Sequence, residues 1–355
     1  MTVVFQKDVN TVTVSAGFSF LDINLGITIS NLAQAEVIWD GRAGQSITTP
    51  NDFFITARLQ STTVIRLQRG GNTGAMVMHF QVIEYTLASG YIVDRGNATL
   101  SVNPLNIAVP TRTQGNRYSR VGVRSSASSF LEDNFVEHRL TSDSNLLVQG
   151  NAAMAGITVE WQTVYAPDQC VHNFTGNASG TSFNVNVSGF GIVKDESFVV
   201  QSMRNNGTVS PGIDPDEIKG AYLSSDTNLE IFALFGDTHF FSAQIVHRPK
   251  NRVDRDNNVY TVTPFNIALV VSVVTAETYV HLATPNEYFA TVNVGPTDAD
   301  EMCHTTQLTS PTQVVLQRFL NTNTTRLVTE VVYLDGNPVT GSAAFITAIK
   351  HRRCV

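Results

Sequence analysis

A 17-residue segment of this chain occurs twice, 160 residues apart. Residues 93–109 read VDRGNATLSVNPLNIAV, and residues 253–269 read VDRDNNVYTVTPFNIAL. Nine of the 17 positions are identical. A match of this length at one offset indicates an internal duplication, so we expect the chain to fold as structural units that recur along it.

Each half of the chain divides again, because three landmarks recur four times in the same order. An acid comes first, a leucine that begins a hydroxyl-rich turn follows seven residues later, and a polar residue inside an apolar strand comes 21 or 22 residues after that. The acids are Asp52, Asp133, Asp216 and Glu301, the leucines are Leu59, Leu140, Leu223 and Leu308, and the polar residues are Gln81, Gln162, Gln244 and Glu330. These intervals predict four modules, arranged as a duplicated pair: residues 1–92, 93–169, 170–252 and 253–355.

The residue pattern inside the modules is that of β-strands. Apolar and polar residues alternate in segments such as 11–14 (TVTV) and 183–187 (FNVNV), and β-branched and aromatic residues are frequent in 157–161 and 327–333. We find no amphipathic pattern long enough for a helix. The sequence therefore predicts an all-β chain of four tandem β-sandwiches, immunoglobulin-like or jelly-roll-like, with the strand order left open. Tandem sandwiches would form a rod of about 25 to 40 Å per module.

Composition limits the partners and the compartment. The net charge of −7 does not favour binding to a nucleic-acid backbone, and no apolar run reaches the roughly 18 residues of a membrane span. The first residues lack the features of a secretory signal, so we expect a protein made in a cytoplasm. The three cysteines are an odd and scattered set, and a disulfide scaffold is not expected.

Two acidic clusters raise the question of a metal site or an enzyme. Asp214, Asp216 and Glu217 form one cluster, and Asp298, Asp300 and Glu301 form the other. They could supply oxygen ligands for Ca²⁺ or paired carboxylates for glycoside hydrolysis, but solvated turns are the interpretation we favour. The eight histidines form no zinc motif, and no nucleophile or phosphate-binding motif is present. We therefore predict no catalytic, cofactor-binding or metal-binding residues and no enzymatic activity.

Two basic runs, residues 247–252 and 350–353, fit either docking patches or a solvated hairpin and a charged tail, and we favour the latter. Three aromatic residues have a diagnostic use. If Trp39, Tyr91 and Tyr118 were exposed together in a groove, they would favour a glycan-binding surface.

One module pattern resembles a known class of protein. In residues 59–85, a leucine and a hydroxyl-rich turn precede VIRLQR, a glycine-rich turn and the final strand FQVIEY, and the second module keeps VEWQTVY at 159–165. This pattern is similar to repeats in structural proteins of tailed bacteriophages. The resemblance implies a non-enzymatic virion component of the collar, tail, fibre or capsid-decoration type. It also implies a homo-oligomer that contacts other virion proteins. From the net charge and the lack of a long apolar run, we expect neither nucleic acid nor membrane as a partner. The alternative is a virion protein that binds a host-surface glycan or receptor.

Overall fold

Antiparallel β-strands form almost all of the regular structure. The computed structural model describes residues 4–45, 50–125, 135–150, 157–205, 218–233, 238–249, 251–261, 263–270, 272–282, 291–292, 303–319 and 324–334. No α-helix occurs in these ranges, which confirms the prediction of an all-β chain. Short 3₁₀ helices connect some of the strands: η1 (Leu32–Gln34), η2 (Pro50–Asp52), η3 (Leu87–Ser89), η4 (Gln114–Asn116), η6 (Lys194–Glu196) and η8 (Thr275–Glu277).

The strands fall into four sets along the chain. The first set is β1 (Val4–Val14), β2 (Phe20–Asn24), β3 (Ala35–Ala43), β4 (Ile55–Leu59), β5 (Val64–Arg69) and β6 (Met76–Tyr85). The second set is β7 (Ile92–Thr99), β8 (Leu105–Ala108), β9 (Arg117–Ser125), β10 (Glu137–Ser142), β11 (Asn145–Gln149) and β12 (Ile157–Tyr165). The third set is β13 (Cys170–Ala178), β14 (Ser182–Asn186), β15 (Ser197–Asn205), β16 (Gly220–Ser225), β17 (Asn228–Phe232) and β18 (His239–His247). The fourth set is β19 (Arg252–Tyr260), β20 (Phe265–Ala268), β21 (Thr278–Leu282), β22 (Thr291–Val292), β23 (Thr305–Ser310), β24 (Gln313–Gln317) and β25 (Thr325–Tyr333).

All four sets share one sheet topology. Their first, third and last strands form one sheet with the last strand in the centre, as in β1-β6-β3 and β13-β18-β15. In the first three sets, the second, fourth and fifth strands form a second sheet, as in β2-β5-β4 and β14-β17-β16. The fourth set follows the same order in β19-β25-β21 and β20-β24-β23, with β22 as an additional partner of β25. The chain is thus a series of small antiparallel sheets, consistent with β-sandwich-like modules.

The hydroxyl-rich turn after each landmark leucine closes a hairpin of the second sheet. In each set, a serine two residues after the leucine accepts a hydrogen bond from the backbone N–H two residues further on, with distances between 3.2 and 3.3 Å. The serines are Ser61, Ser142, Ser225 and Ser310. A serine hydroxyl that bonds to a nearby N–H stabilises a turn, so the recurrence of this residue type has a local structural cause.

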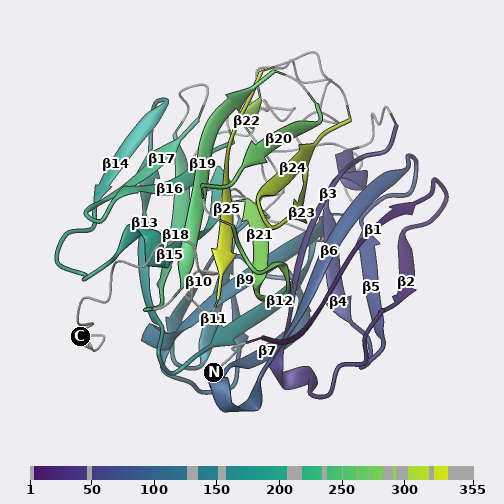
Figure 1. Ribbon diagram of the computed structural model, residues 1–355, viewed down its shortest axis with the longest axis horizontal. Coiled ribbons are helices and arrows are strands. Elements are labelled where there is room, and N and C mark those ends of the chain that lie inside the picture. The colour runs from purple at the N-terminus through teal and green to yellow at the C-terminus, as the bar shows by residue number, and fades with distance from the viewer. Residues whose placement is uncertain are drawn as a thin grey trace.

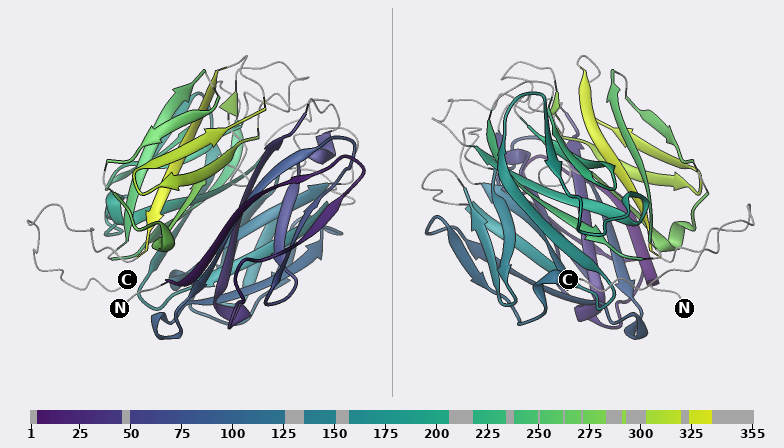
Figure 2. Two further views of the ribbon diagram at one scale, coloured as in Figure 1. Left: turned by 45° about the vertical axis from the view of Figure 1, so that its right-hand side comes forward. Right: turned by 90° about the vertical axis from the view of Figure 1, so that its left-hand side faces the viewer.

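The four sets do not form the expected rod, because the first set contacts the fourth. Figure 1 shows β1–β6 on the right and β13–β18 on the left, with the fourth set between them. The two views of Figure 2 place the yellow strands of the fourth set beside the purple strands of the first. The backbone N–H of Thr306 on β23 donates to the carboxylate of Asp40 on β3 over 2.9 Å, and both residues are buried. The expectation of a rod is therefore wrong, because buried contacts close the arrangement on itself.

An apolar core lies where four sheets meet, namely those that the first, third and last strands of each set form. The residue two positions after each landmark polar residue belongs to this core and is almost fully buried: Ile83, Val164, Val246 and Val332. Its partner across the strand pair is Glu36, Tyr118, Phe198 or Tyr279. Phe198 lies edge-on to both Tyr118 and Tyr279, with ring centroids 5.5 and 5.9 Å apart. Side chains from all four sets thus share one core.

No helix in the described part of the chain is long and apolar enough to cross a membrane.

Candidate functional site

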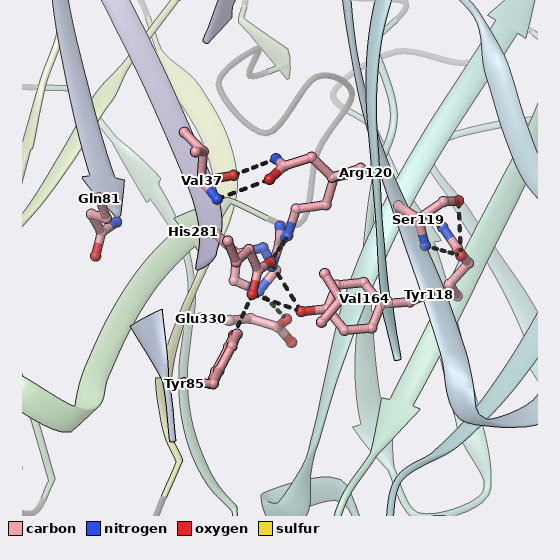
Figure 3. A network of polar contacts seen from close by, with 12 residues as sticks. Val37, Gln81, Tyr85, Tyr118, Ser119, Arg120, Val164, His281 and Glu330 are labelled. Carbon is pink, nitrogen blue, oxygen red and sulfur yellow. Dashed lines mark hydrogen bonds and ion pairs between the residues drawn. The ribbon is translucent and has the colours of Figure 1, made fainter. Parts of the chain in front are cut away.

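The landmark polar residues join each strand set to its neighbour. The amide of Gln162 accepts from the Val37 N–H over 2.9 Å and donates to the Val37 carbonyl over 2.7 Å (Figure 3). Gln244 bonds in the same two-way manner to Ser119, at 2.8 and 2.9 Å, and Gln81 to Val280, at 3.3 and 2.7 Å. Each partner belongs to the third strand of the neighbouring set. Because these groups are buried, each amide satisfies two backbone groups that would otherwise lack a partner.

Glu330 occupies this position in the fourth set and completes the ring. Its carboxylate accepts from the Val199 N–H over 2.7 Å, but a carboxylate cannot donate to the Val199 carbonyl. It accepts instead from Arg255 over 2.6 Å and lies 3.2 Å from His281 Nε2. Burial acts to raise the pKa of Glu330, but Arg255 and His281 outweigh it and hold that pKa below its ordinary value. These contacts join the second set to the first, the third to the second, the fourth to the third and the first to the fourth.

A second buried carboxylate lies at the shared core. Glu36 Oε1 accepts from Arg120 Nε over 2.6 Å and from the Tyr118 hydroxyl over 3.0 Å, and Glu36 also accepts from the Tyr85 hydroxyl (Figure 3). Burial raises the pKa of both tyrosines well above the ordinary value, and the nearby carboxylate raises it further. The two hydroxyls therefore stay protonated as donors, and the network is a buried structural contact between the first two sets.

A cavity of about 280 Å³ lies between the first and second sets. Strands β3 and β4 form one wall, and β7 and β12 form the other. The lining residues that bear on its chemistry are Trp39, Arg58, Gln60, Arg95, Asn97, Glu160, Trp161 and Gln162. Gln60 and Asn97 are exposed, so the cavity reaches the surface beside them. The contact between Gln162 and Val37 lies in its wall.

The charges around this cavity do not cancel. Glu160 lies 3.3 Å from Arg58 and 3.1 Å from Arg124, which together outweigh its single negative charge. Arg95 donates to the backbone carbonyls of Leu32 and Ala35, and among the described residues no carboxylate forms an ion pair with it. Burial lowers the pKa of Arg95 to about 10, so this side chain is still cationic at neutral pH. The cavity region therefore carries an excess of positive charge.

Two glycines make room for the two tryptophans. Gly96 pairs with Trp161 across β7 and β12, and a Cβ at position 96 would lie 2.6 Å from the indole ring. The other sets have a side chain at this position: Asn10, Phe174 and Asp256. A Cβ on Gly122 would lie 2.5 Å from Trp39. The tryptophans could be noticed in the sequence, but their meeting at one cavity depends on which sets are neighbours.

The predicted acidic landmarks are only partly described. Asp52 is fully buried and accepts from the Thr73 N–H over 3.1 Å and the Gly74 N–H over 3.0 Å, so in the first set the acid holds a turn. The other landmark acids and both acidic clusters lie outside the described residues: Asp133, Asp214, Asp216, Glu217, Asp298, Asp300 and Glu301. Within the described ranges, no three His, Cys, Asp or Glu side chains are grouped as a metal site.

Four residues for which the sequence left a surface role open are buried. Trp39, Tyr91 and Tyr118 are buried, with exposed fractions of 5%, 3% and 2%, so they form no exposed aromatic groove. Arg248, expected in a solvated hairpin, is 5% exposed and bonds to the Tyr91 hydroxyl and Asp168.

Cys170 is disulfide-bonded, although no disulfide scaffold was expected, and Cys303 is buried. The basic run at 350–353 lies outside the described residues.

No family model matches the chain, and a search of curated proteins finds no relative.

Proposed function

We propose that this protein is a non-enzymatic structural component of a bacteriophage virion, of the collar, tail, fibre or capsid-decoration type. The observation that carries the proposal is the ring of buried contacts made by Gln81, Gln162, Gln244 and Glu330. These side chains are used to hold strand sets together. A scaffold of interlocked β-structure resists local opening, which suits a particle component better than a protein that must move during turnover.

The proposal includes the domain organisation. We propose that each strand set is one β-sandwich module, so that the chain holds four modules with boundaries near residues 92, 169 and 252. The shared strand order of the sets supports this, and β7, β13 and β19 begin at Ile92, Cys170 and Arg252. We further propose that copies of the chain assemble through symmetric contacts, since closed symmetric oligomers are the usual form of such proteins. Other virion proteins would be its further partners.

The test is the native mass of the purified protein, measured by light scattering with negative-stain images of the same fraction. A closed oligomer of compact subunits is the expected result. Immunogold labelling of the phage particles that encode the protein should then place it at one position on the virion. A 38.7 kDa monomer at every concentration, together with unlabelled particles, would contradict the proposal.

The alternative function is recognition of a host-surface glycan or receptor by a virion protein. The cavity between the first and second sets supports this alternative, because it combines two tryptophans with arginine and amide side chains. Ligand sites commonly combine aromatic walls with a few placed polar groups.

A further inference from the structure

We propose that the cavity between β3–β4 and β7–β12 binds a ligand of monosaccharide size that carries a carboxylate, such as a uronic acid. This inference deepens the glycan-binding alternative and does not depend on the virion assignment. It rests on the size of the cavity, on Arg95, which forms no ion pair among the described residues, and on the aromatic and amide groups of the walls.

The size of the cavity selects a small ligand. Its volume of about 280 Å³ lies just below the usual range for ligand sites, roughly 300 to 1,000 Å³. At about 30 Å³ for each water molecule, it corresponds to roughly nine waters. One sugar ring with its substituents fits that space, whereas an extended chain would have to leave through the side marked by Gln60 and Asn97.

The fourth set has, at the equivalent position, the negative charge that the ligand would supply to Arg95. Arg95 and Arg255 occupy equivalent positions, because each pairs with the landmark polar residue across its strand pair. Arg255 is neutralised by Glu330 at 2.6 Å, but the residue opposite Arg95 is Gln162, which is neutral. A carboxylate entering the cavity would therefore meet the one of these two arginines that forms no ion pair among the described residues. Charge-assisted hydrogen bonds between guanidinium and carboxylate are strong and directional.

The remaining lining groups suit a sugar better than a bare anion. Trp39 and Trp161 offer aromatic carbon from opposite walls, against which the C–H groups of a sugar ring can pack. The amides of Gln60 and Asn97 can both donate to and accept from hydroxyl groups.

Intrinsic fluorescence gives a direct test, because the two tryptophans of the chain, Trp39 and Trp161, both line this cavity. We would titrate the full-length protein with glucuronate, with glucose as the neutral analogue and with acetate as the bare carboxylate. A saturable change with glucuronate, and at least about tenfold weaker binding of the other two, is the expected result. No saturable change with glucuronate, or equal affinity for glucose or acetate, would overturn the proposal.

The variant Gln162→Glu sharpens the test, because Glu330 shows that the ring accommodates a carboxylate at this position. The new acid would neutralise Arg95, so glucuronate affinity should fall about tenfold or more. Gln307→Glu on the exposed face of β23 makes the same chemical change away from the cavity and should leave the affinity unchanged.

If Gln162→Glu does not fold, Gln60→Glu adds the charge at the exposed side of the cavity and should also weaken glucuronate binding. Unchanged affinity in a folded Gln162→Glu or Gln60→Glu protein would overturn the role of charge. The native mass of the same samples reports on assembly independently.

Discussion

The contact between the fourth and third sets differs from that between the second and first in one functional group. Glu330 and Gln162 hold the same place on β25 and β12, and both accept from a backbone N–H of the next set. The carboxylate also neutralises an arginine and contacts a histidine, whereas the amide satisfies a second backbone group and leaves its arginine unpaired by an acid. At the Glu330 contact the opposite charges therefore compensate each other. The Gln162 contact instead borders a cavity with excess positive charge. The comparison teaches that a repeated structural position can keep its packing role while its electrostatic role changes.

Removal of the Glu330 carboxylate should have the largest effect on stability. Glu330→Ala leaves both Arg255 and the Val199 N–H without any acceptor at position 330 in a buried site, so we expect the free energy of unfolding to fall by about 3 to 5 kcal/mol. Urea titration measures this change. Asp22→Ala, which breaks an ion pair with Arg66 at the surface, is the control and should cost about 1 kcal/mol or less. An equal loss in the two variants would show that the buried pair has no special weight.

The amide contacts should come next. Gln81→Leu leaves the N–H and the carbonyl of Val280 buried without a side-chain partner, which should lower the free energy of unfolding by about 2 to 4 kcal/mol. Gln307→Leu on the exposed face of β23 is the matched control, with an expected change near zero. If Gln81→Leu were as stable as the unmodified protein, the ring of contacts would not be needed for closure.

As the pH falls, the amide contact of Gln244 should weaken at a higher pH than the carboxylate contact of Glu330. His138 Nδ1 lies 3.1 Å from the Ser119 hydroxyl, next to the contact with Gln244, and burial lowers the pKa of His138 to about 3. The unfolded chain takes up this proton near its ordinary pKa of 6.5, so the stabilisation is complete above that pH and declines as the pH falls toward 3. From pH 7.5 to pH 5 the free energy of unfolding should drop by about 2 kcal/mol from this group.

The variant His138→Gln isolates that contribution, since glutamine does not titrate in this range. Urea titrations at both pH values should show a smaller drop in the variant than in the unmodified protein. An identical drop in the two would assign the acid sensitivity to other groups. Because the pKa of Glu330 lies below its ordinary value, the carboxylate contact should persist at pH 5.

Conversion of the carboxylate contact into an amide contact should have the smallest effect. Glu330→Gln keeps a hydrogen-bond acceptor for the Val199 N–H and gains a donor for its carbonyl, but it leaves Arg255 in the state of Arg95. We expect the free energy of unfolding to fall by about 1 to 2 kcal/mol, less than in Glu330→Ala. A loss as large as that of Glu330→Ala would mean that the ion pair, and not the hydrogen bond to Val199, dominates this contact.

Much of the fold follows from the sequence, since local patterns decide it. Alternation of apolar and polar residues predicted an all-β chain because side chains of a strand point to opposite faces in turn. The recurring serine after each landmark leucine bonds to a backbone group two residues away, so its structural reason is also local. The landmark glutamines were visible as a regularity of the sequence. Their role was not, because the partner of Gln81 is 199 residues away at Val280.

The tertiary structure alone decided how the sets meet. Sequence periodicity carries no information on whether repeated units extend as a rod or close, since the contacts that decide this join surfaces of different units. Closure buried Trp39, Tyr91 and Tyr118, so these three side chains form no exposed groove. It also brought Gly96, Arg95 and the two tryptophans to one cavity. The sequence determined the strands, the turns and their repetition, whereas long-range packing determined the ring and the candidate site, because packing depends on which distant residues become neighbours.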